Sequence, residues 1–228
     1  MLMMLVRTLS LLVLFALASA RANAATIEAG VADQNAAALA DAVVSLTPVS
    51  AAAPRVVGAS AAMDQRGLKF VPQVLAIQTG TAVKFPNSDQ VRHHVYSFSP
   101  IKKFELRLYK DTPSEPLVFD QAGVATIGCN IHDWMLGYIV VVDTPFFAKT
   151  GADGSARIDV PAGVYDLRVW HARADEAETR VAERVLVDEA GLQRQIARTL
   201  RAADPEPPPP SELEQKFRKH QKAQDDGA

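Results

Sequence analysis

Short runs of apolar and β-branched residues, separated by glycine, proline, asparagine and aspartate, recur along most of this chain. Runs of about four to eight residues between turn-forming residues predict β-strands, and no long stretch has the apolar spacing of a helix. The alternation of strands and helices that builds a parallel sheet is also missing, so we expect an all-β chain with antiparallel sandwiches or barrels. The expected strands are residues 27–32, 42–46, 74–78, 82–85, 94–99, 117–119, 125–128, 138–142, 157–160, 165–170 and 181–187.

The first residues have the features of a cleavable signal peptide. Arg7 supplies a positive charge, residues 9–18 are apolar, and small residues in the Ala-x-Ala pattern end at Ala20 and Ala24. The apolar run is shorter than the roughly 18 to 20 residues that a membrane span needs. We therefore expect residues 1–24 to be removed on export to the periplasm, which leaves a mature chain without stable membrane insertion.

The charge of the mature chain argues against nucleic acid as a partner. Loss of Arg7 and Arg21 with the signal peptide leaves 22 of the 24 basic residues against 26 acidic residues, a net charge of −4 with histidine neutral. Binding to nucleic acid needs a concentrated basic surface that neutralises phosphates. We therefore look for a function among small molecules, metals and other proteins.

The chain has one cysteine, Cys129, which is followed by a histidine and a methionine at equal spacing. In an oxidising compartment a lone cysteine forms no intrachain disulfide, so it is buried, paired with another chain or bound to a metal. Cys129, His132 and Met135 lie three residues apart, in a loop between two expected strands that can bring their side chains together. Alone, a cysteine or a methionine is more often a core residue, but thiolate, imidazole and thioether in one loop favour copper. Thioether is a poor ligand for zinc, which argues against that metal.

A copper site that transfers electrons needs a second imidazole. His93 and His94 are available about 36 residues before the cysteine, at the start of an expected strand. Adjacent residues of a strand point to opposite faces, so only one of the two reaches the metal. The alternation by itself allows His94, because Tyr96 and Phe98 share its face, and both histidines remain candidates at this point.

Four stretches of the sequence form a set of motifs: Phe70-Val-Pro72, Gly80-Thr81-x-Val83-x-Phe85-x-Asn87, His93-x-Val95 and Cys129-x-x-His132-x-x-Met135. They resemble the cupredoxin family, in particular the plastocyanin and amicyanin group. The residues of these motifs are most similar to those of periplasmic plastocyanin-like proteins called methylamine-utilisation proteins. The resemblance covers residues 61–144.

This resemblance implies a Greek-key β-sandwich with one type 1 copper ion, bound by His93, Cys129, His132 and Met135. His93 takes the first position because the family has His-Asn-Val where this chain has His93-His94-Val95. His94 therefore stands in place of an asparagine, and this departure keeps the choice between the two histidines open.

The flanking stretches resemble a second family, the transthyretin-like sandwich of carboxypeptidase regulatory domains, in residues 42–48 and 149–169. We expect residues 26–50 and 145–201 to pair into one small immunoglobulin-like β-sandwich, into which the first domain is inserted. The alternatives are two domains in series, or N-terminal strands that complete the first sheet. Residues 202–228 contain four consecutive prolines and then a charged stretch, and are expected to form a disordered tail.

Together these features predict a carrier of single electrons, not an enzyme, that meets a redox protein such as a cytochrome or a dehydrogenase. The main alternative is a periplasmic protein that buffers or delivers copper without redox turnover, with His94 helping to capture or release the metal. A copper enzyme is less favoured, because nitrite or oxygen chemistry needs further histidine-rich centres and only His171 and His220 remain.

Overall fold

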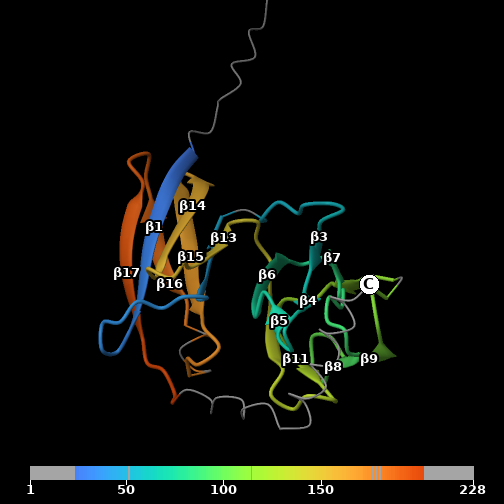
Figure 1. Cartoon of the computed structure of the whole chain (residues 1–228). Coiled ribbons are helices and arrows are strands. Elements are labelled where there is room, and N and C mark those ends of the chain that lie inside the picture. The colour runs from blue at the N-terminus through green and yellow to red at the C-terminus, as the bar shows by residue number, and fades with distance from the viewer. Residues whose placement is uncertain are drawn as a thin grey trace, which may run out of the picture.

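The computed structural model describes residues 24–50, 52–113, 115–175, 177, 179 and 181–202. This part of the chain forms seventeen β-strands, and Ala177 and Thr179 are helical. The all-β class expected from the sequence, with two β-sandwiches, is confirmed (Figure 1). The expected signal peptide and tail lie outside the described residues, except for Ala24 and Ala202. No helix within the described ranges is long and apolar enough to cross a membrane.

The central sandwich consists of two sheets. The larger sheet has the order β6 (Val74–Gln78), β12 (Leu136–Val142), β11 (Gly123–Cys129), β8 (His93–Ser97) and β9 (Phe104–Tyr109). The smaller sheet has the order β10 (Leu117–Phe119), β7 (Thr81–Lys84) and β3 (Ser60–Ala62). A two-stranded hairpin, β4 (Asp64–Gln65) and β5 (Phe70–Val71), lies beside them. Strands of both sheets therefore frame one core.

The core of the central sandwich follows from the period-two pattern of its strands. In β11, Ala125, Ile127 and Cys129 are buried while the residues between them are exposed or half-buried. Successive side chains of a strand point to opposite faces, so this pattern directs one face of β11 inward. Phe85, Phe119 and further residues of both sheets join these side chains in a single apolar cluster. Cys129 thus lies at the end of a strand that the core holds in place.

The flanking sandwich is built from strands that precede and follow the central one in sequence. One sheet has the order β14 (Ser155–Pro161), β1 (Ala24–Asp33) and β17 (Leu192–Arg198). The other has the order β13 (Phe147–Lys149), β2 (Val43–Pro48), β15 (Gly163–Trp170) and β16 (Glu183–Val187). Its own buried cluster includes Ile27, Leu46 and Leu167. The first two strands of the chain therefore pair with strands that come more than a hundred residues later.

The expectation of antiparallel pairing throughout is wrong in three places. β1 pairs in parallel with β17, β6 with β12, and β3 with β7. Parallel neighbours need a long connection, which is usually a helix that crosses the sheet. Here the connecting chain passes through other strands of the sandwich, so parallel pairs form without the helical pattern that the sequence lacks.

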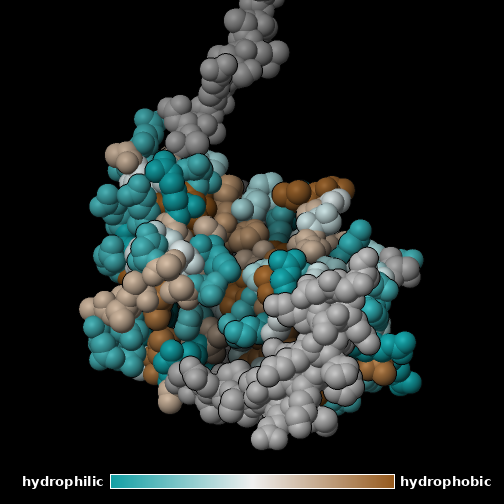
Figure 2. All heavy atoms as spheres, viewed as in Figure 1, coloured by the Kyte–Doolittle hydropathy of each residue, from teal (hydrophilic) through white to brown (hydrophobic). Residues whose placement is uncertain are grey.

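The two sandwiches lie side by side (Figure 1). Residues of β6 and β12 contact residues of β2 and β15. Val43, Val74 and Val140 are buried between them, and the rings of Tyr138 and Trp170 are 5.4 Å apart. In the same view, hydrophilic residues cover much of the surface and hydrophobic residues show in small separate areas (Figure 2). The buried apolar side chains of the described residues form one cluster in each sandwich and a small one between them.

Candidate metal centre

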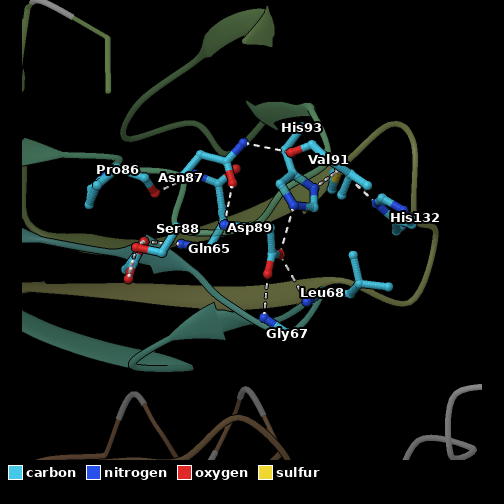
Figure 3. Close-up of polar contacts among 12 residues, drawn as sticks. Gln65, Gly67, Leu68, Pro86, Asn87, Ser88, Asp89, Val91, His93 and His132 are labelled. Carbon is cyan, nitrogen blue, oxygen red and sulfur yellow. Dashed lines mark hydrogen bonds and ion pairs between the residues drawn. The ribbon is translucent and has the colours of Figure 1, made fainter. Parts of the chain in front are cut away.

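Three donor side chains meet at one end of the central sandwich. His93 begins β8 and Cys129 ends β11, and these strands pair so that Cys129 lies opposite Val95. The Cys129 Sγ atom is 3.6 Å from Nδ1 of His93 and 3.9 Å from Nδ1 of His132. The ligand atoms of the three residues all lie within 4.8 Å of one another, so this group could hold a metal ion. Figure 3 shows two of these residues, His93 and His132.

The donors are shielded from water to different degrees. His93 is completely buried, and Cys129 and Met135 are each 2% exposed. His132 is half-buried, and its ring lies 5.5 Å from the ring of Trp134. The loop between β11 and β12 is closed by a hydrogen bond from the Met135 N–H to the carbonyl oxygen of His132, at 2.9 Å. A bound ion would therefore be enclosed by protein, with His132 as the ligand nearest the surface.

Met135 is brought into the same core as Cys129. Both belong to the apolar cluster of the central sandwich, where the thioether is packed away from solvent. The sequence predicts Met135 as the fourth ligand, and its position in the same apolar cluster as Cys129 is compatible with that role.

Of the two adjacent histidines, the structure brings only His93 to Cys129. In β8, His93, Val95 and Ser97 are buried, so His93 shares the inward face. His94 lies on the other face, where its Nε2 atom is 2.9 Å from the carboxylate of Glu105. The two histidines thus lie on opposite faces of β8, as the alternation of side chains predicts. His93 is on the face that points into the core, and His94 is on the other face together with Tyr96.

The surroundings of Cys129 favour its thiolate form. Burial raises the pKa of the thiol, but hydrogen bonds with His93 and with the backbone of His94 and Ile131 outweigh this and lower the pKa to about 6. Burial lowers the pKa of His93, but its hydrogen bonds to Cys129 and Asp89 raise it above the ordinary value. These contacts favour a thiolate beside a protonated imidazole in the metal-free site, and a bound cation would take the place of that proton.

These interactions predict that the Cys129 thiol ionises at a lower pH than an ordinary cysteine thiol does. In the metal-free protein, thiolate absorbance in the ultraviolet should appear with a midpoint near pH 6, with thiol below it and thiolate above it. His93→Ala removes the main donor and should move the midpoint upward, toward the ordinary pKa of 9.0. Because Cys129 is the only cysteine, the signal belongs to one residue. A midpoint near 9.0 in the unsubstituted protein would contradict the arrangement.

Asp89 is a site residue that the sequence did not reveal. Its carboxylate lies 2.9 Å from Nε2 of His93, on the side of the ring away from Cys129. The only signal was an acidic residue four positions before a candidate ligand, in a loop rich in polar residues. Such loops are common, and the contact depends on how the loop folds back onto the β4–β5 hairpin.

Comparisons with known proteins give structural likenesses alone. No family model and no curated protein matches the chain. Among solved structures, a copper-containing nitrite reductase from Thermus scotoductus is 25% identical over 42% of this chain and 25% of that one, with a TM-score of 0.35. A reduced variant of amicyanin is 24% identical over 45% and 99%, with a TM-score of 0.33. A purple cupredoxin from Nitrosopumilus maritimus is 24% identical over 37% and 99%, with a TM-score of 0.32.

These overlaps cover less than half of this chain, which in turn spans a quarter of the nitrite reductase. The chemistry of the site therefore follows from its own donors. Two imidazole Nδ1 atoms beside one thiolate, with a buried thioether in the same core, fit the ligand preferences of copper better than those of zinc.

Proposed function

We propose that this protein is an exported, periplasmic carrier of single electrons with one type 1 copper ion bound by His93, Cys129, His132 and Met135. The observation that carries the proposal is the position of the Cys129 Sγ atom, 3.6 and 3.9 Å from the Nδ1 atoms of two histidines. A trigonal set of two imidazoles and a thiolate, with a weak thioether, is the ligand set of copper sites that transfer electrons. When bound, copper supplies a one-electron couple between Cu(I) and Cu(II).

The protein's part is to hold the donors still and keep water away. His93 and Cys129 are fixed by the pairing of β8 with β11, and both are buried. A site that does not rearrange between its two states loses little energy in reorganisation, and burial of the surrounding side chains tunes the potential. Three buried or nearly buried donors on two paired strands and one short loop support this role.

Electrons would enter and leave at His132, the donor nearest the surface. Ile131 is 50% exposed and Trp134 is 36% exposed on either side of it. Apolar and aromatic side chains around a half-buried ligand suit a small, short-lived interface with a redox protein. We propose a cytochrome or a dehydrogenase as this partner.

The proposed carrier differs from a copper-handling protein in its redox behaviour. Within the described residues, the group of His93, Cys129 and His132 is the one that the geometry brings together as a candidate metal site. His94, which a handling protein could use for capture, is bound to Glu105 instead. A carrier keeps its copper in both oxidation states, whereas a delivery protein releases it readily in one of them.

The experiment is a titration of the purified mature protein with Cu(II), followed by cycles of reduction and reoxidation. We expect one copper per chain, an intense visible band from charge transfer between thiolate and copper, and full recovery of the band in each cycle. A competing chelator added in the reduced state should remove little copper. Loss of the metal on reduction would support handling, and a protein that stays colourless with copper would refute the type 1 site.

A further inference from the structure

The carboxylate of Asp89 is enclosed between the ring of His93 and the backbone of the β4–β5 hairpin (Figure 3). Its Oδ2 atom is 2.9 Å from Nε2 of His93, and the side chain of Asp89 is only 13% exposed. The N–H of Gly67 donates to Oδ1 at 2.6 Å, and the N–H of Leu68 donates to Oδ2 at 3.0 Å. Both carboxylate oxygens are therefore occupied, and the side chain has one orientation.

The hairpin turn takes an uncommon backbone shape to provide these two donors. Gly67 and Leu68 have φ values of 63° and 57°, and the N–H of Arg66 bonds to the carbonyl of Lys69 at 3.0 Å. Positive φ at both central residues defines a tight hairpin turn in which glycine or asparagine is the usual second residue. Leucine is strained there, and strained backbone persists where surrounding contacts require it. The contact made by the Leu68 N–H is such a requirement.

The loop that carries Asp89 is fixed independently. The N–H of Asp89 donates to Oδ1 of Asn87 at 3.0 Å, and Nδ2 of Asn87 donates to the carbonyl of Val91 at 2.9 Å. Asn87 is buried, so the segment between it and His93 is held at both ends. Asp89 thus approaches His93 from a rigid position.

We propose that Asp89 is a positioning residue of the metal centre, which holds the proton of His93 on Nε2 and leaves Nδ1 as the donor atom that faces Cys129. This inference rests on the proposed function. A neutral imidazole has one N–H and one acceptor nitrogen, so a carboxylate at Nε2 determines which nitrogen is free. The Nδ1 atom so freed is the one 3.6 Å from Sγ. The negative charge also favours the doubly over the singly charged ion, and so lowers the reduction potential.

The test is Asp89→Asn, with Glu105→Gln as the matched control. Glu105 also has a carboxylate oxygen 2.9 Å from a histidine Nε2, but its partner His94 is turned away from Cys129. Asp89→Asn should weaken Cu(II) binding by about 10–100-fold. It should also raise the reduction potential by an amount equivalent to about a tenfold change in the ratio of the two oxidation states, about 59 mV. Glu105→Gln should change neither quantity, and equal effects of the two substitutions would overturn the proposal.

A second measurement needs neither copper nor a substitution. In the metal-free, unsubstituted protein, at a pH where the ring is neutral, the ¹⁵N chemical shifts of His93 should show the proton on Nε2. A proton on Nδ1 would overturn the proposal, whatever the variants do. If the protein does not bind copper as a type 1 site, the proposed function fails, and this measurement still decides the position of the proton. If copper binds and Asp89→Asn behaves like Glu105→Gln, the proposed function stands and the role of Asp89 fails.

Discussion

Replacement of Cys129 by alanine should abolish the intense visible band of the copper-loaded protein. That band requires a bond between thiolate and copper, and Cys129 is the only thiol in the chain. The neighbouring donors cannot replace it, because His93 and His132 supply only imidazole nitrogens. We expect residual Cu(II) to bind the two imidazoles weakly and without strong colour. Visible absorption reports the loss of the band, and equilibrium competition for copper, measured on the same samples, reports the loss of affinity.

His94→Ala is the control for this substitution. His94 is next to a proposed ligand and is itself a possible copper donor, but its Nε2 atom contacts Glu105. The variant should keep both the band and the affinity. Loss of the band in His94→Ala, or its retention in Cys129→Ala, would contradict the proposed ligands.

The sequence favoured the candidate ligands that lie close together in the chain, and of these the structure brings Cys129 and His132 together. Cys129, His132 and Met135 lie in one short loop, so their spacing alone indicates that they can meet. The choice between His93 and His94 depends on which face of β8 turns inward, and that depends on packing against the rest of the core. Asp89 was out of reach, because its role depends on a turn at Gly67 and Leu68 that lies in another part of the chain.

The strands that sequence reasoning missed are polar or at an edge. In β17, Ile196 is the only residue classed as buried, so neither alternation nor an apolar run marks this strand. β17 forms because its backbone pairs in parallel with β1 along seven residues. β9 is likewise at the end of its sheet, and no residue of it is buried, so it is absent from the expected strands. β6 and β10 also lie at the ends of their sheets, but they were predicted with the right bounds, because each is a short run of mostly apolar residues.

Ile127→Ala should destabilise the metal-free protein by about 2–5 kcal/mol. Ile127 is completely buried, and its side chain points to the same face of β11 as Cys129, two residues later. Removing its methyl groups leaves a cavity that the two sheets cannot easily close, because interiors are close-packed. Leu167→Ala is the matched substitution in the flanking sandwich, where Leu167 is 2% exposed. Urea unfolding of each variant, with and without copper, measures both effects.

Copper should distinguish the two substitutions, because an ion that binds only the folded site stabilises the unit that contains it. At a free copper concentration of 1,000 times the Kd, this linkage amounts to about 4.1 kcal/mol. The two sandwiches have separate cores, joined by a small cluster around Val43, Val74 and Val140. We therefore expect two unfolding transitions. Copper should raise the urea midpoint of the transition whose midpoint Ile127→Ala lowers. It should not change the midpoint of the transition that Leu167→Ala affects. A single transition that copper and both substitutions shift together would show instead that the small cluster makes the two sandwiches one cooperative unit.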